Sequence, residues 1–229
     1  SRRNEVINFV KSGLNDLSIS RTSFTWGIKV PNNCKHVIYV WLDALTNYLS
    51  ALNFPNTDDN LYKNFWPASL HVIGKDILRF HAIYWPAFLL AANIKPPIRV
   101  FGHGWILSGD EKMSKSKGNI LNPLEIIENY GIDELRYYLM KEVSHGSDAS
   151  ISLKNLASCI NSDLANNYGN LCQRVFSFIK TNCNNSVNRE GDFSESDKKI
   201  IVQTDNLTKE LRGLMENQNL NNYIKSVIN

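Results

Sequence analysis

The order of apolar segments in the first hundred residues most constrains the fold. Runs rich in β-branched residues at 37–41, 70–73 and 98–101 predict strands, and helical patterns separate them. Strands joined through helices form crossover connections, so we expect a parallel sheet buried on both faces. Ligands of such sheets bind at the carboxyl ends of the strands. The sequence therefore predicts an α/β unit with a site at that edge.

The chain changes character after residue 121. Asn122-Pro123 is typical of a helix start, because asparagine caps a helix and proline suits its first position. No strand pattern of comparable quality follows residue 121. We therefore expect an α/β unit followed by an all-helical unit, with helices at 123–130, 133–143, 153–180, 195–217 and from 220 onward.

A lysine-rich stretch, residues 111–119, joins the two parts. It reads Glu-Lys-Met-Ser-Lys-Ser-Lys-Gly-Asn, so small polar residues separate its lysines. A cationic loop of this kind suits a polyphosphate whose charge moves during a reaction. The alternative from composition alone is a solvated basic turn.

Two further groups lie where the first strands end. Gly74-Lys75-Asp76 begins a helix, which places backbone N–H groups and a carboxylate at the ligand-binding edge of the sheet. The Asp76 carboxylate could accept hydrogen bonds from a ribose hydroxyl. Alternatively, it only caps its helix. The helix that follows carries an aromatic stripe, and the segment after residue 40 carries a second one. Together they predict a deep aromatic pocket for a long, polarizable side chain such as a thioether. For any single aromatic residue, core packing is the stronger explanation. The two stripes comprise Ile77, Phe80, His81, Tyr84, Trp85 and Phe88, and Trp41, Ala44 and Tyr48.

One helical stripe in the second part carries groups that read nucleic acid. Asn166, Asn170 and Arg174 recur every four residues and so share one helix face. Amides read base edges, and arginine stacks on bases or binds phosphate. A solvated polar face is the alternative.

Composition narrows the class of protein. With 229 residues, 43% hydrophobic and 21% charged, the chain is ordinary for a globular protein, and its net charge of +3 permits a nucleic-acid partner. No long apolar run predicts a membrane span. Four widely spaced cysteines without a C-x-x-C pair predict no metal site in this segment and a reducing, cytoplasmic setting. The start, without a methionine, suggests a segment of a longer chain.

Residues 112–116, Lys-Met-Ser-Lys-Ser, match the KMSKS signature of class I aminoacyl-tRNA synthetases. Beside the segments 40–44, 71–76 and 80–87, the chain resembles the bacterial methionyl-tRNA synthetases over nearly its whole length. The resemblance implies the second half of a Rossmann-like catalytic domain with the KMSKS loop at 1–121, stem-contact helices at 122–151 and an incomplete anticodon-binding helical bundle at 152–229. It implies a methionine–tRNA ligase, EC 6.1.1.10, that uses ATP with Mg²⁺, methionine and tRNA(Met).

The resemblance also implies residue roles. Lys112 and Lys115 would neutralise ATP phosphates, and Ser114 and Ser116 would shape the loop. Gly74 and Asp76 would hold the ribose, and the backbone near Ile106 would lie against adenine. Asn166, Asn170 and Arg174 would contact the anticodon. Arg21 is a weaker candidate near the substrates. The methionine pocket would be lined by Trp41, Ala44, Leu45, Tyr48, Ile77, Phe80, His81 and Trp85.

Two features depart from the family pattern. No H-[IV]-G-H motif, the family's HIGH signature, occurs, because His71-Val72-Ile73-Gly74 only looks similar and lies in the wrong unit. Leu45 stands where some members carry proline. Because the half of the fold that carries HIGH is missing, the segment alone is expected to be inactive. The alternatives are a non-catalytic tRNA-binding or interaction module and a class I synthetase for another apolar amino acid.

Overall fold

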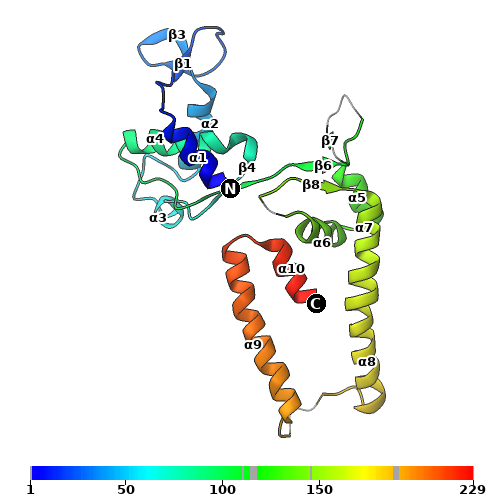
Figure 1. The fold of residues 1–229 in the computed structure, drawn as a ribbon. Coiled ribbons are helices and arrows are strands. Elements are labelled where there is room, and N and C mark those ends of the chain that lie inside the picture. Colours follow the sequence, from blue (N-terminus) through cyan, green and yellow to red (C-terminus); the bar gives the residue numbers. More distant parts are fainter. Residues whose placement is uncertain (1, 110, 114–117, 145, 188–190, 229) are drawn as a thin grey trace. The chain divides into compact units, whose positions relative to one another are not determined.

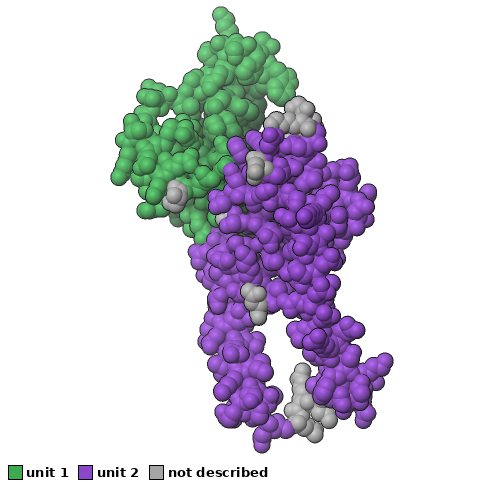
Figure 2. All heavy atoms as spheres, turned by 45° about the vertical axis from the view of Figure 1, so that its right-hand side comes forward, with its two compact units in different colours: residues 1–103 green, residues 104–229 purple. Residues whose placement is uncertain are grey.

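The computed structural model describes residues 2–109, 111–113, 118–144, 146–187 and 191–228. The chain divides into two compact units, Ser1–His103 and Gly104–Asn229 (Figures 1 and 2). Small sheets and many helices make up a mixed α/β architecture with a helical C-terminal part, so the predicted fold class is confirmed. The functional boundary at residue 121 stays a prediction.

A small antiparallel sheet opens the first unit, after helix α1 (Arg2–Lys11). Its strands, β1 (Ser20–Arg21), β2 (Lys29–Val30) and β3 (Asn33–Ile38), lie in the order β1-β3-β2. The turn between β2 and β3 is Pro31-Asn32, where proline presets one φ angle and Asn32 adopts a φ of 62°.

The predicted parallel strand at 37–41 is wrong. β3 ends at Ile38 and pairs only antiparallel, and Val40 begins helix α2 (Val40–Ser50). Leu45 and Leu49 of α2 are 1% and 3% exposed. Burial of these two residues at helical spacing outweighs the weak β preference of Val40, because tertiary packing routinely overrides local propensity.

The other two predicted strands are confirmed. β4 (His71–Gly74) and β5 (Val100–His103) pair in parallel, with His71 opposite Val100 and Gly74 opposite His103. Helix α3 (Asn60–Phe65) precedes them. The crossover contains a 3-10 turn (Lys75–Ile77), a π-helical turn (Phe80–Tyr84) and helix α4 (Trp85–Ala91). The carboxyl ends of β4 and β5 therefore meet at one edge.

The second unit contains a strand that the sequence pattern did not predict. β6 (Ile106–Ser108) pairs with β7 (Glu111–Lys112) and, in parallel, with β8 (Ala149–Ile151). Three residues are too few to show a period, so β8 is visible only through its pairing with β6.

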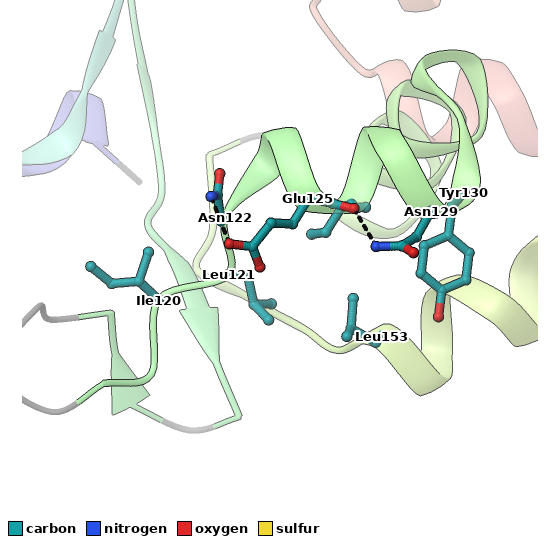
Figure 3. Close-up of a pocket in the computed structure, with 8 residues that line it drawn as sticks. Ile120, Leu121, Asn122, Glu125, Asn129, Tyr130 and Leu153 are labelled. Carbon is teal, nitrogen blue, oxygen red and sulfur yellow. Dashed lines mark hydrogen bonds between the residues drawn. The ribbon is translucent and has the colours of Figure 1, made fainter.

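The remaining elements are helices close to their expected bounds: α5 (Pro123–Tyr130), α6 (Ile132–Glu142), α7 (Leu153–Cys159), α8 (Asn170–Asn182), α9 (Glu195–Glu216) and α10 (Leu220–Ile228). The Asn122 side chain accepts a hydrogen bond from the Leu124 N–H and donates one to Glu125 (Figure 3), so the predicted start of α5 is confirmed. The helix expected at 153–180 is interrupted by a π-helical segment, η4 (Ile160–Gly169). A Cβ on Gly169 would lie 2.9 Å from the Leu164 carbonyl oxygen, so glycine permits this wider turn.

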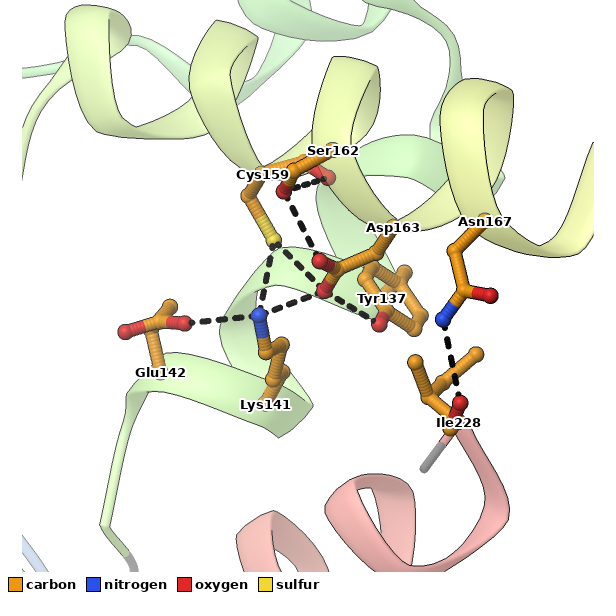
Figure 4. Close-up of polar contacts among 8 residues, drawn as sticks. All are labelled: Tyr137, Lys141, Glu142, Cys159, Ser162, Asp163, Asn167 and Ile228. Atoms are coloured by element: carbon orange, nitrogen blue, oxygen red, sulfur yellow. Dashed lines mark hydrogen bonds and ion pairs between the residues drawn. The ribbon is translucent and has the colours of Figure 1, made fainter.

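A polar group centred on Asp163 joins α6 to η4 (Figure 4). Its carboxylate accepts hydrogen bonds from Tyr137 at 2.7 Å and from Ser162 at 2.8 Å, and it forms an ion pair with Lys141. The side chains of Asp163 and Lys141 are only 13% and 19% exposed. Burial alone would raise the pKa of the Asp163 carboxyl, but these donors lower it to about 2. Burial raises the pKa of the neighbouring Cys159 thiol to about 11, so this thiol stays protonated and packs as a core residue.

The core of the second unit depends on Leu156, which is 1% exposed. Leu156→Ala should lower the free energy of unfolding by about 3 kcal/mol, because it leaves a cavity beside Leu135 and Tyr138. Urea denaturation followed by circular dichroism measures this. Leu153→Ala, at a position 42% exposed, is the matched control and should lower the free energy of unfolding by under about 1 kcal/mol. Equal losses in the two variants would contradict the placement of Leu156 in the core.

The Asp163 group should make stability depend on acid pH. The carboxyl titrates near 3.8 when unfolded and at about 2 when folded, so its contribution is present above pH 3.8 and is lost as pH falls toward 2. Between pH 5 and pH 3 this loss is about 1 kcal/mol. Asp163→Asn should reduce the pH dependence of the urea midpoint by that amount. Asp205→Asn, on the exposed face of α9, should not.

Candidate functional site

Five predicted pocket residues come together in the first unit. α2 supplies Trp41 and Tyr48, and the π-helical turn and the start of α4 supply Phe80, His81 and Trp85. The rings of Trp41 and Phe80 stack with centroids 3.8 Å apart, and Trp41 meets His81 edge-on at 6.2 Å. The arrangement is a continuous aromatic wall, with polarizable faces that suit an apolar or thioether group.

His81 is held at both ring nitrogens. Its Nδ1 lies 3.1 Å from the Ile77 carbonyl oxygen, and its Nε2 lies 2.9 Å from the Tyr48 hydroxyl. Because a carbonyl only accepts, Nδ1 carries the proton and Nε2 accepts from Tyr48. Burial lowers the pKa of His81 despite the opposing effect of the Ile77 carbonyl, so the ring is neutral at neutral pH.

His71 joins this cluster, although its role was not predicted. Its ring lies 4.2 Å from that of Tyr48, and it is 6% exposed. Burial, then the nearby His81, lowers its pKa. Within the described part of the chain, His71 Nε2 and Trp85 Nε1 are buried without a hydrogen-bond partner, and such atoms usually meet a ligand or an ordered water. In β4, His71 and Ile73 are buried and Val72 is exposed. The sequence signal was the period of two along a strand, which puts His71 on the same face as Ile73.

The other predicted pocket residues are placed differently. Leu45 packs in the core with Leu49 and Leu89, and Ala44 is exposed on α2. Ile77 is half-buried and enters the cluster through its carbonyl. Arg21 donates to the carbonyls of Ser18 and Ser20 and lies 4.1 Å over the Tyr39 ring.

Gly74 and Asp76 lie where β4 ends. A Cβ on Gly74 would come 2.5 Å from Asp76 Oδ1, so the carboxylate folds closely over the glycine. The N-cap of the 3-10 turn is Gly74, and Asp76 is therefore not its cap. The acid is exposed, which leaves it able to accept hydrogen bonds from a ligand.

The second unit carries the signature stretch and Ile106, which is 39% exposed on β6. Lys112 ends β7, and its Nζ lies 4.0 Å from the centroid of the Trp105 ring. Met113 packs against the core around Leu156. Ser114, Lys115 and Ser116 lie outside the described residues.

A small hollow of about 120 Å³ follows this stretch (Figure 3). Its walls include Leu121, Glu125, Tyr130 and Leu153. It is below the usual range of ligand pockets, roughly 300–1,000 Å³, so it is no candidate for a nucleotide.

The predicted nucleic-acid stripe is exposed in the second unit. Asn166 lies in η4, and Asn170 and Arg174 lie in α8. The Asn170 amide donates to the Asn166 carbonyl at 2.9 Å, so the two residues are neighbours along the helix surface. Asn167 instead donates to the Ile228 carbonyl at 3.1 Å, which ties η4 to α10 (Figure 4).

The described residues contain no group of three His, Cys, Asp or Glu side chains that could hold a metal ion. None of their helices is long and apolar enough to cross a membrane.

Known proteins resemble this chain closely. The methionine–tRNA ligase of Brucella suis biovar 1 is 54% identical over 219 residues, 96% of this chain and 42% of the relative. That of Rickettsia typhi is 60% identical over 182 residues, 80% of this chain and 36% of the relative. The solved structure of Mycobacterium tuberculosis methionyl-tRNA synthetase in complex with methionyl-adenylate has a TM-score of 0.93 at 49% identity, over 99% of this chain and 44% of that one. The chain thus spans less than half the length of these relatives.

A family model described as tRNA synthetases class I (M) matches residues 1–176. This match covers more than half of the chain, and the chain belongs to the class I (M) family of tRNA synthetases.

Proposed function

We propose that the chain is part of a methionine–tRNA ligase. The protein activates methionine with ATP to methionyl-adenylate and transfers it to the terminal adenosine of tRNA(Met). The observation that carries the proposal is the aromatic wall of Trp41, Phe80 and His81 in a chain with the KMSKS signature at 112–116. Residues 1–121 serve catalysis, 122–151 contact the tRNA stem and 152–229 bind the anticodon, in the cytoplasm.

The first step needs no protein nucleophile. The methionine carboxylate attacks the α-phosphorus of ATP, the bond to the bridging oxygen breaks, and pyrophosphate leaves with that oxygen. Lys112 and Lys115 offset the charge on the leaving phosphates, with Ser114 and Ser116 shaping their loop. Gly74 and Asp76 hold the ribose, and the backbone at Ile106 lies against adenine. Mg²⁺ arrives with the nucleotide, because this ion is commonly held by substrate phosphates.

The methionine side chain binds at the aromatic cluster. Apolar rings desolvate the thioether, and the neutral His81 places no charge beside it. Trp41, Tyr48, Phe80 and Trp85 form the wall, and Leu45 supports it from the core. The Ile77 carbonyl holds His81, and Ala44 is exposed on the helix that carries Trp41. This chemistry favours methionine over shorter branched amino acids.

Removal of the Trp41 ring tests the pocket. In the full-length protein, Trp41→Ala should raise the KM for methionine by about 10- to 100-fold, because it removes a large apolar contact. The KM for ATP should change far less. Pyrophosphate exchange measures both. Phe65→Ala, at an exposed ring of the same unit, is the control. Equal rises in both constants would make Trp41 a packing residue only.

The amide stripe makes a separate prediction. Asn170→Ala should reduce discrimination between a CAU anticodon and an altered one by about tenfold, the scale of one lost amide–base contact. The comparison of kcat/KM for aminoacylation of the two tRNAs measures it. Asn182→Ala is matched, since its amide donates to the Phe178 carbonyl at 3.0 Å in the same local pattern. If Asn170→Ala leaves the ratio of the two kcat/KM values unchanged, this helix face is a solvent-exposed surface without an anticodon contact.

A further inference from the structure

The first lysine of the signature stretch lies over an aromatic ring. Lys112 Nζ is 4.0 Å from the centroid of Trp105, within the range of a cation–π contact, and tryptophan is the strongest partner for one. Lys112 is exposed and Trp105 is half-buried. Both belong to the second unit.

The strand register explains the contact. Leu107 of β6 lies opposite Lys112 of β7, and Trp105 stands two residues before Leu107. Residues two apart share a face, so Trp105 is a diagonal neighbour of Lys112 on one face of the hairpin. Aromatic and long side chains reach each other across such a diagonal.

The backbone beneath the ring is fixed. The Trp105 N–H donates to Asp148 Oδ1 at 2.9 Å, and its carbonyl accepts from the Ala149 N–H at 2.9 Å. A Cβ on Gly104 would come 2.0 Å from the Ser147 carbonyl oxygen, so only glycine allows this close approach. The main chain that carries the Trp105 ring is therefore held in place.

The main chain of Lys112 is held as well. The Asn119 side chain donates to the Lys112 carbonyl at 3.3 Å, and the next residue, Met113, packs on the core. The remaining freedom lies in the lysine side chain, which is rich in rotamers. The ring restricts that freedom without neutralising the ammonium, whereas a carboxylate partner would compete with phosphate for it.

We propose that Trp105 is a positioning residue for the ATP reaction, whose ring holds the Lys112 ammonium ready for the phosphates of the nucleotide. The inference rests on the proposed function. Trp105 acts through Lys112 and reduces the conformational entropy that this side chain loses when phosphate binds. Loss of the Trp105 ring should therefore weaken the binding of ATP and leave the binding of methionine unchanged.

Replacement of the ring in the full-length protein tests this role by pyrophosphate exchange. Trp105→Leu should raise the KM for ATP by about three- to tenfold, and Trp105→Phe should fall between it and the wild type, following the order of ring strength. The KM for methionine should stay within about twofold. Trp26→Leu, which removes an 89% exposed tryptophan from the first unit, is the control and should change neither constant.

An NMR measurement reports the contact independently of activity. In protein with ¹³C-methylated lysines, Lys112 should show an upfield ring-current shift that Trp105→Leu abolishes, with Lys112→Arg used for assignment.

The proposal is overturned by the absence of this shift, by an unchanged KM for ATP in Trp105→Leu, or by equal rises in the KM for ATP and the KM for methionine. If Trp105→Leu fails to fold, Trp105→Phe carries the test, and a KM for ATP equal to the wild type overturns it. If the wild-type protein shows no pyrophosphate exchange, the proposed function is refuted. The ring-current shift of Lys112 still shows whether its side chain contacts Trp105.

Discussion

The half-buried carboxylate of Asp163 is the interaction that holds α6 and η4 of the second unit together. A charge at this depth is costly unless it is paired, and Tyr137, Lys141 and Ser162 all bind it. These partners draw one side of η4 onto α6, and the bond from Asn167 to Ile228 adds α10. Asn166 and Asn170 of the amide stripe are exposed beside these contacts. A structural ion pair thus holds the helix that carries the surface we propose for the anticodon.

The first unit uses neutral polar groups for a similar purpose. His81 is fixed between the Ile77 carbonyl and the Tyr48 hydroxyl, and this orientation presents its edge to Trp41. Both the aromatic cluster and the amide stripe include a π-helical turn. Such turns widen the helix locally and are frequent at functional sites. Here they place side chains that regular α-helical spacing would distribute differently.

Sequence patterns predicted the elements that carry strong local signals. The cap at Asn122, the long helices and the strands at β4 and β5 were expected because capping, helical period and β-branched runs are local properties. The strand predicted at 37–41 failed because Val40, despite its β preference, begins a helix that buries Leu45 and Leu49. β8 was missed because a three-residue strand shows no period and exists only through β6.

By itself, the sequence determined the family, the α/β-then-helical order and the residue types of the candidate site, since motifs and periodicity depend on residues close in the chain. Only the tertiary structure decided that His71 joins the aromatic cluster, that Leu45 belongs to the core, and that Trp105 lies beneath Lys112. These contacts depend on strand register, burial and the close approach of Gly104 to Ser147. Such relations join residues through the fold, so no local pattern records them.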